Sequence, residues 1–261
     1  MKADKPKLSV LIPVLNEGIN LKIMLKILMA TIDIPHEVLV VYDKLDDDSI
    51  PVVKAVQNGY PQLKSVHNKL GRGVLNAVMA GVDAASGKYI LIIAADDIGP
   101  VLAINDMILL MDGGCDLVSC TRYAYGGRVL GGSPIGRFLS RLANKLFNLM
   151  SGSALTDSTI GIKMFKPSLI DKLMLEAQPI GFAFAFEMAM KAQLAGMKLG
   201  EVPIISINRF YGGKSSFKFG SWVKEYSKWF LWGLWQMHAA GGMKRKIIIH
   251  IPEKITSKRG K

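Results

Sequence analysis

The stretch that most constrains this chain is an unbroken apolar run, Tyr89 to Ile93, which leads to two adjacent carboxylates, Asp96 and Asp97. A run this short and this apolar predicts a strand that is buried on both faces of a parallel sheet. The Gly-Pro pair that follows cannot continue a central strand. Carboxylates at such a strand end suit a divalent cation, often one that holds a substrate diphosphate. The same residues also allow a simpler interpretation, in which Asp96 caps a helix near Val101 and Asp97 is solvated.

Other segments have the composition of buried strands, and helical segments separate them. The predicted strands before residue 122 are Leu8–Val14, Glu37–Tyr42, Leu63–His67, Tyr89–Ile93 and Asp116–Thr121. Strands that alternate with helices at this spacing predict an α/β fold with a doubly wound, mostly parallel sheet.

Three of the predicted strands are followed by polar or acidic residues, namely Asn16, Asp43 and Asp96. This repetition is typical of a nucleotide-binding crevice. Each residue alone is more often a helix cap, and Asn16 can cap a helix that runs to about Ala30. The Gly71-Arg72-Gly73 loop would let backbone N–H groups approach a phosphate, although an ordinary turn also explains two glycines.

The pattern changes after Arg122. A glycine-rich loop covers residues 123–132, and a helix is predicted from about Pro134 to Met150. On that helix Arg137, Arg141 and Asn144 share one face, beside a stripe of apolar residues. The polar face is either a solvated surface or a binding surface. A strand-like IKMF segment, a helix at 182–195 and a last strand at 201–207 follow.

Positive charge is concentrated near the C-terminus. The chain has a net charge of +12, and the part from Arg209 onward has 12 Lys and Arg against 2 acids, so it carries 12 − 2 = +10. Such a segment suits an anionic partner. A Trp-rich helix is predicted at 222–240, too short in its uncharged part to span a membrane, which needs about 20 apolar residues. It is either a membrane-interface segment or a helix packed on the core.

Two cysteines beside a predicted buried strand make a disulfide framework improbable. The charged start of the sequence lacks the pattern of a signal peptide. These features favour a cytoplasmic protein that associates peripherally with a membrane.

The ordered set of motifs resembles the family 2 GT-A glycosyltransferases of the dolichol-phosphate mannosyltransferase and polyprenyl-phosphate glycosyltransferase type. The matching segments are IPVLNE at 12–17, NKLGRG at 68–73, CTRY at 120–123, DSTIGIK at 157–163, VPI at 202–204 and RFYGGKSS at 209–216. Two positions depart from the family pattern. Ala94 occupies the place of the first acid of the metal motif, and the second-strand motif, which is usually two Asp followed by Gly-Ser, reads Tyr42-Asp43-Lys44-Leu45.

The resemblance implies a GT-A fold in residues 1–217 and a basic membrane-interface tail in residues 218–261. It implies transfer of a sugar, with inversion, from a nucleotide sugar to a polyprenyl phosphate at the cytoplasmic membrane face. A divalent cation, Mg²⁺ or Mn²⁺, is the expected cofactor. The cation site rests on Asp96 and Asp97, uses weaker outer ligands, or is lost.

The resemblance also implies roles for individual residues. The expected catalytic residues are Asp96, Arg122, Asp157 and Arg209. The expected donor-binding residues are Pro13, Asn16, Glu17, Asp43, Arg72 and Asp96. The expected contacts to the acceptor phosphate are Arg122, Arg137, Arg141, Arg209 and Lys214, because arginine can make paired hydrogen bonds to phosphate.

Two alternatives stay open at this point. The acceptor is a saccharide or protein hydroxyl, which needs a base such as Asp157 or Glu187, or the chain is an inactive module that binds a nucleotide sugar. A nucleic-acid partner fits poorly, since the tail aromatics cluster in one hydrophobic helix.

Overall fold

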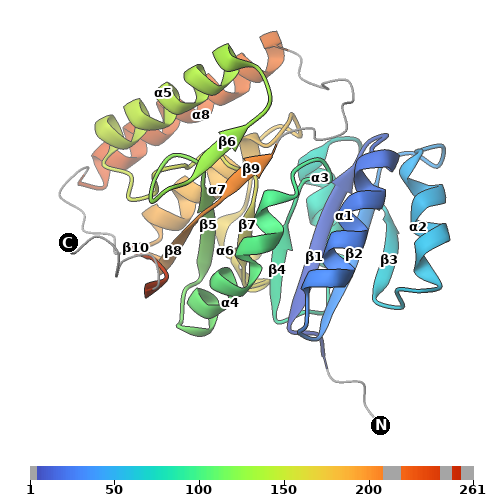
Figure 1. Ribbon diagram of the computed structural model, residues 1–261. Helices are drawn as coiled ribbons and strands as arrows, with labels where there is room; N and C mark the ends of the chain where they lie inside the picture. Colours follow the sequence, from blue (N-terminus) through green and yellow to red (C-terminus); the bar gives the residue numbers. More distant parts are fainter. Residues whose placement is uncertain (1–4, 208–218, 242–248, 254–261) are drawn as a thin grey trace.

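A computed structural model of the chain describes residues 5–207, 219–241 and 249–253. The predicted α/β architecture is confirmed: a central sheet has helices on both faces (Figure 1). The strand order is β10-β8-β5-β7-β4-β1-β2-β3. Its strands are β1 (Leu8–Val14), β2 (His36–Tyr42), β3 (Leu63–His67), β4 (Tyr89–Ile92), β5 (Leu117–Thr121), β7 (Lys163–Phe165), β8 (Leu199–Pro203) and β10 (Ile249–His250).

One strand interrupts the parallel arrangement. β7 lies between β4 and β5 and runs antiparallel to both, whereas the other pairs in this sheet are parallel. The carboxyl ends of β1, β2 and β4 therefore meet at one edge, as the strand-end argument requires. β7 also brings the segment that follows Asp157 into the centre of the sheet.

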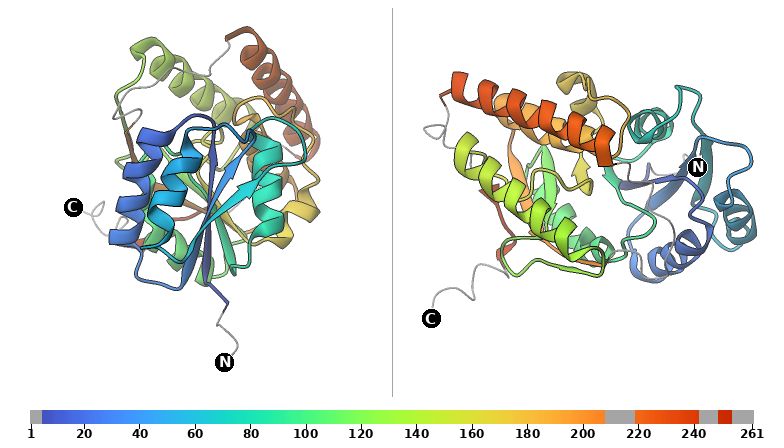
Figure 2. Two further views of the ribbon diagram at one scale, coloured as in Figure 1. Left: turned by 90° about the vertical axis from the view of Figure 1, so that its right-hand side faces the viewer. Right: turned by 90° about the horizontal axis from the view of Figure 1, so that it is seen from above.

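Two hydrophobic cores flank the sheet. One is covered by α1 (Gly18–Thr31), α2 (Ser49–Gln57) and α4 (Ile104–Asp112), which follows the short 3₁₀ helix η1 (Gly99–Ala103). The other is covered by α3 (Val74–Ala84), α6 (Ser168–Leu173), α7 (Ala183–Leu194) and α8 (Phe219–Ala239). Figure 2 shows α1 and α2 on one side of the sheet and α3 on the other.

The predicted cap of α1 is wrong. Asn16 precedes the helix with a φ of 55° and makes no side-chain cap. The acidic loop after β2 caps the helix instead: Gly18 N donates to Asp48 Oδ1 (2.9 Å) and Glu17 N donates to Ser49 Oγ (3.1 Å). These N–H groups have no partner inside the helix, and the positive end of its dipole favours carboxylates.

The single strand predicted at 201–207 is two strands in two sheets. β8 ends at Pro203, and β9 (Ile205–Ile207) pairs with β6 (Arg128–Leu130) inside the segment predicted as a glycine-rich loop. The chain leaves the main sheet directly after Pro203. This small parallel sheet closes over the end of β4, because Gly99 lies so near Ile205 that a Cβ at Gly99 would be 1.8 Å from the Ile205 carbonyl oxygen.

Two long helices lie together beyond the carboxyl ends of the strands (Figure 1). α5 (Pro134–Ser151) packs against α8, and α8 packs against α7. The interior side of α8 is part of the second core, with Trp229 only 2% exposed. The helix predicted in the tail therefore packs one face on the core. The division into a GT-A domain (1–217) and a membrane-interface tail (218–261) stays a prediction. No helix in the described part of the chain is long and apolar enough to cross a membrane.

Candidate active site

The predicted donor residues follow three adjacent parallel strands. β4, β1 and β2 are neighbours in the sheet, so Asp96, Asn16 and Asp43 lie beyond the same edge. Pro13 is in β1, opposite Val41 of β2. The structure thus brings the ends of these strands together, while contact of their residues with a donor stays a prediction.

Asp43 organises the loop after β3. Its Oδ1 accepts a hydrogen bond from Asn68 Nδ2 (2.7 Å), and its Oδ2 accepts one from Gly73 N (2.9 Å). Gly71 and Gly73 have φ values of 101° and 124°, a backbone region that other residues rarely adopt. Arg72 between them is exposed. The loop is therefore held in a fixed shape that presents Arg72 at the strand-end edge.

The two adjacent carboxylates of the metal motif have different surroundings. Asp97 is buried and accepts hydrogen bonds from Ser206 Oγ (2.6 Å), Ile207 N (2.9 Å) and Gly99 N (3.2 Å). Its two oxygens join the end of β4 to β9, and the role of Asp97 as a metal ligand stays a prediction. Asp96 is partly exposed.

These surroundings limit how a cation would be held. Among the described residues, no three His, Cys, Asp or Glu side chains form a group that could hold a metal ion. Mg²⁺ often needs only one or two carboxylates, with substrate phosphates and water completing its shell. The donor set present therefore fits a cation shared between Asp96 and a bound diphosphate, and does not fit a site made by protein ligands alone.

Arg122 and Asp157 form the central ion pair of the site. Arg122 Nε donates to Asp157 Oδ2 (2.7 Å), and Nη2 donates to Asp157 Oδ1 (2.9 Å). The guanidinium also lies over the ring of Tyr123, 4.9 Å from its centroid. Burial opposes the charge on Arg122, but Asp157 outweighs that effect and raises the pKa of the guanidinium above its usual value.

The exposure of this pair decides what each member can do. Asp157 is fully buried, whereas 19% of the Arg122 side chain is exposed. Within the described structure, Nη1 of Arg122 makes no hydrogen bond. The pair therefore presents a fixed cation to the site, while its carboxylate is inaccessible.

Two further buried ionisable residues, Glu201 and Lys163, lie behind this pair, and sequence reasoning missed them. Glu201 on β8 accepts hydrogen bonds from the Thr156–Asp157 segment, and burial raises the pKa of Glu201 to about 7. Lys163 on β7 is also fully buried, and burial lowers its pKa to about 8. The sequence did contain a signal for this cluster, namely a lysine at the start of the strand-like KMF segment. A lysine buried in a strand needs hydrogen-bond partners or an opposite charge nearby.

The polar face predicted on α5 is only partly at the surface. Arg137 Nη1 donates to the Gly131 carbonyl (2.8 Å), and Arg141 is exposed. Asn144 is buried and donates to Thr159 Oγ1 (2.8 Å), so it is not part of a solvated face. Arg209 and Lys214 lie outside the described residues.

Glu187, the second candidate base, has a structural role. It is fully buried on α7 and accepts hydrogen bonds from Glu176 N (2.7 Å) and Ala177 N (2.8 Å). It also pairs with Lys191 at 2.7 Å. Its carboxylate holds the loop before α7 and is not directed to a reacting group.

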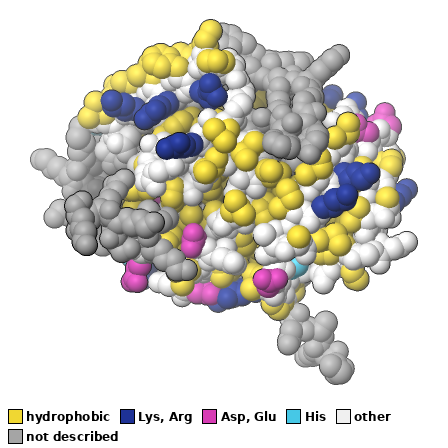
Figure 3. Space-filling model, viewed as in Figure 1, with side chains coloured by type: hydrophobic (Ala, Val, Ile, Leu, Met, Phe, Trp, Pro, Cys, Tyr) yellow, Lys and Arg dark blue, Asp and Glu magenta, His cyan; other side chains and the backbone are white. Residues whose placement is uncertain are grey.

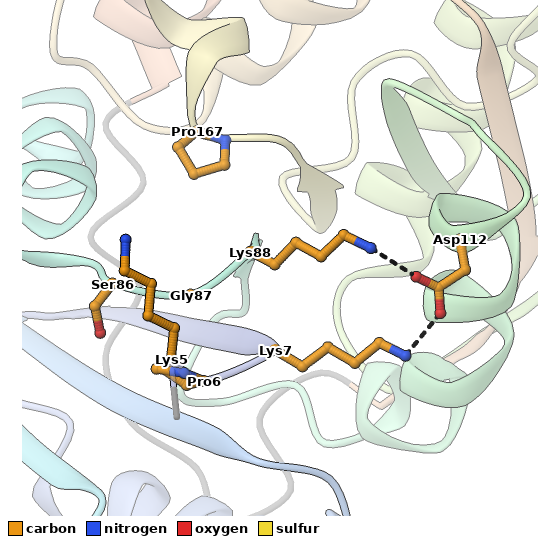
Figure 4. A pocket seen from close by; sticks show the side chains of 8 residues that line it. All are labelled: Lys5, Pro6, Lys7, Ser86, Gly87, Lys88, Asp112 and Pro167. Carbon is orange, nitrogen blue, oxygen red and sulfur yellow. Dashed lines mark hydrogen bonds and ion pairs between the residues drawn. The ribbon is translucent and has the colours of Figure 1, made fainter. Parts of the chain in front are cut away.

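A pocket exists at the opposite edge of the sheet. Residues that precede β1 and β4 line it, and Lys7 and Lys88 both pair there with Asp112 (Figure 4). In an open α/β sheet, ligands bind beyond the carboxyl ends of strands. This pocket lies beside the amino ends and shares no residue with the site.

Comparison with known proteins identifies the class. Glycosyl transferase family 2 matches residues 9–174, more than half of the 261 residues, so the chain belongs to this family.

Two of its relatives are dolichol-phosphate mannosyltransferases. The one from Pyrococcus furiosus is 26% identical over 231 residues, which cover 85% of this chain and 64% of that protein. The one from Mycosarcoma maydis is 26% identical over 210 residues, covering 77% and 70% respectively. The chain thus spans slightly less than two thirds of the Pyrococcus relative.

Solved structures confirm the GT-A fold. Glucosyl-3-phosphoglycerate synthase from Mycobacterium tuberculosis, in complex with phosphoglyceric acid, superposes with a TM-score of 0.67 at 18% identity, covering 89% of this chain and 81% of that one. The same enzyme with Mn²⁺, UDP-glucose and phosphoglyceric acid gives 0.66 at 16% identity, with the same coverage.

Proposed function

We propose that this glycosyltransferase moves a sugar, with inversion, from a nucleotide sugar to a polyprenyl phosphate at the cytoplasmic face of a membrane. The observation that carries the proposal is the Arg122–Asp157 pair, with its paired hydrogen bonds of 2.7 and 2.9 Å and its partly exposed guanidinium. A cation fixed in this way suits an anionic substrate group, because charge-assisted hydrogen bonds from arginine are strong and directional.

The reaction needs little from a base. In the proposed step, an oxygen of the acceptor phosphate forms a bond to the anomeric carbon, and the bond from that carbon to the donor diphosphate breaks. The electron pair leaves with the nucleoside diphosphate. The second pKa of a phosphate monoester is near ~6, so the nucleophile is already mostly ionised at pH 7. The remaining task is to hold two anions together, which Arg122 and the neighbouring cations would do.

A hydroxyl acceptor is less well supported. Such an acceptor needs a general base within hydrogen-bond reach. The two candidates, Asp157 and Glu187, are both fully buried and already hydrogen-bonded to protein groups. A saccharide reacts through a hydroxyl group, so this argument weighs against a saccharide acceptor as well.

A divalent cation fits the donor side of the site. It would be held by Asp96 and the donor diphosphate, and when bound it would offset the charge that develops on the leaving group. The relative with Mn²⁺ and UDP-glucose supports this expectation for the fold in general.

The surface of α5 and α8 supports association with a membrane. α5 exposes seven large hydrophobic side chains and contains no acidic residue. α8 exposes three more large hydrophobic side chains. They are Ile135, Phe138, Leu139, Leu142, Leu146, Leu149 and Met150 on α5, and Val223, Leu231 and Trp235 on α8. Figure 3 shows hydrophobic side chains along the rim where α5 lies, with Lys and Arg beside them. Apolar residues flanked by cations are typical of a helix that lies in the plane of an anionic membrane.

The direct test is transfer in liposomes that contain a polyprenyl phosphate. A panel of nucleotide sugars would be supplied, and glycosyl phospholipid would be measured by mass spectrometry. Phosphoglyceric acid would be tested in parallel as a soluble acceptor, since relatives of the same fold bind it. Product on the soluble acceptor alone would overturn the lipid assignment.

Asp96→Ala tests the donor side. The variant should lose transfer while keeping its fold, and Asp46→Ala, which removes an exposed acid from the loop after β2, is the control. Full activity of wild type in a chelator, together with full activity of Asp96→Ala, would remove both the cation and Asp96 from the proposal.

A further inference from the structure

A buried carboxylate supports the Arg122–Asp157 pair from behind. Glu201 lies on β8 and is fully buried. Its Oε1 accepts hydrogen bonds from Thr156 N (2.8 Å) and Asp157 N (3.3 Å), and its Oε2 accepts one from Thr156 Oγ1 (3.0 Å). One side chain thus fixes the backbone at Thr156 and at Asp157, the residue that pairs with Arg122.

Hydrogen bonds also link Glu201 to β5 through Thr156. Thr156 Oγ1 lies 2.7 Å from Thr121 Oγ1, and Thr121 is the residue before Arg122. β5 and β8 are paired in parallel, with Ser119 opposite Glu201. Both ends of the Arg122–Asp157 contact are therefore tied to the same two strands, and the position of the guanidinium depends on Glu201.

Lys163 balances the charge of this cluster. It lies opposite Ser119 in β7 and donates to Ser119 Oγ (3.0 Å), so Lys163, Ser119 and Glu201 form one row across three strands. Arg122 and Lys163 are the two basic groups of this cluster, and Asp157 and Glu201 are the two acidic groups. Buried charges are tolerated when they are compensated and hydrogen-bonded.

We infer that Glu201 is a positioning residue for glycosyl transfer, acting through Thr156 and Asp157 to aim the Arg122 guanidinium at the anionic part of the substrate. The inference rests on the proposed function, because it assumes that Arg122 meets a phosphate. Its physical basis is that catalysis is sensitive to small displacements of a group that binds the transition state.

The test compares Glu201→Ala with Glu201→Gln. Alanine removes all three hydrogen bonds that Glu201 accepts, and we expect kcat/KM for the acceptor substrate to fall about 10- to 100-fold, since a displacement near 1 Å can cost about 100-fold in rate. Glutamine keeps the oxygen that accepts from the backbone and should recover most of the rate. Donor binding, measured separately, should change little in either variant, because Asp43 and the 68–73 loop are untouched.

Glu37→Ala is the matched control. Glu37 is another buried carboxylate that accepts hydrogen bonds, from Ser9 Oγ and Ser86 N, but it lies at the start of β2, away from the strand ends. Its loss should leave kcat/KM of the folded protein unchanged. An equal fall in Glu37→Ala and Glu201→Ala would show a general effect of lost stability and overturn the inference.

A spectroscopic readout separates this inference from the proposed function. In protein labelled with ¹⁵N-arginine, the Arg122 Nε–H signal, assigned with Arg122→Lys, should exchange slowly with solvent in wild type and Glu201→Gln and fast in Glu201→Ala. Slow exchange in Glu201→Ala would overturn the inference, even if wild type proved active. Absence of transfer by wild type with every acceptor would reject the proposed function and leave this measurement valid.

A second variant covers the case in which Glu201→Ala does not fold. Thr156→Val removes the hydroxyl that bonds Glu201 and Thr121 but keeps the backbone N–H. It should also speed exchange at Arg122 and lower the rate, and wild-type values for both would contradict the inference.

Discussion

At the scale of single residues, the site depends on which charges are exposed. Arg122 and Asp157 have opposite charges and direct contact, yet only the cation reaches the surface. The anion serves to orient the cation. The presence of an aspartate in the sequence therefore does not show whether it acts as a general base or only orients a neighbouring side chain.

Arg122→Lys tests the geometry of this contact. Lysine keeps the charge that Asp157 needs but cannot make paired hydrogen bonds. Loss of a charge-assisted hydrogen bond costs about 1.5–3 kcal/mol, so kcat/KM should fall roughly 10- to 150-fold. Lys54→Arg, a swap between the same residue types on the exposed side of α2, is the control. Steady-state kinetics that are the same for both variants would reject the role of Arg122.

Glu37 gives a prediction about acid stability. Burial alone would raise its pKa, but hydrogen bonds from Lys64, Ser9 and Ser86 lower it to about 2 from 4.5. Because the folded-state pKa is depressed, the stabilisation is present above about pH 4.5 and is lost as the pH falls toward 2. The shift corresponds to at most about 3 kcal/mol.

Urea unfolding of wild type and Glu37→Gln measures this effect. Wild type should be the more stable protein at pH 7, and the difference in unfolding free energy should shrink as the pH approaches 2.5. A difference that stays constant over this range would contradict the ionic contribution of Glu37.

At the scale of elements, α5 and α8 each combine two faces. Their inner sides pack on each other and on the core, through residues such as Phe147 and Trp229, while their outer sides expose apolar side chains. Exposed apolar patches of this kind mark interaction surfaces.

The double variant Phe138→Glu/Trp235→Glu tests the membrane role of these faces. The two side chains are 65% and 68% exposed, so the fold should survive. Binding to anionic liposomes should fall, because burial of each large apolar side chain contributes about 1.5–3 kcal/mol. Sedimentation with liposomes measures the effect, and added salt should release part of the wild type.

Leu102→Glu is the control for this experiment. Leu102 is 78% exposed in η1, on a different part of the surface. An equal loss of binding in the control would indicate a general effect of added negative charge, and unchanged sedimentation of the double variant would reject the membrane face.

At the scale of the whole molecule, α8 completes the second core. Gly233 of α8 lies against Met190 of α7 and Phe147 of α5, so closely that a Cβ there would be 2.1 Å from the Met190 sulfur. The C-terminal helix is thus built into the fold that carries the site.

Two tryptophans of α8 provide a matched test of this conclusion. Trp229→Ala should destabilise the protein by about 3–5 kcal/mol, because it leaves a cavity in the core, whereas Trp235→Ala should change stability by at most about 0.5 kcal/mol. Denaturant unfolding measures both. Similar values for the two variants would show that α8 contributes no more to the core than a surface helix does.

The sequence by itself determined the alternation of strands and helices, the polar strand ends and the family. These properties are local, because the apolar composition of a run such as Tyr89–Ile93 is enough to predict that it is buried. Only the tertiary structure decided which of two adjacent carboxylates is a structural residue, because the partners of Asp97 on β9 lie more than 100 positions away in sequence. It likewise decided that Asp157 pairs with Arg122, that β7 is antiparallel, and that α8 has a core face. Hydrogen-bond partners and burial depend on the path of the whole chain, and no local pattern specifies that path.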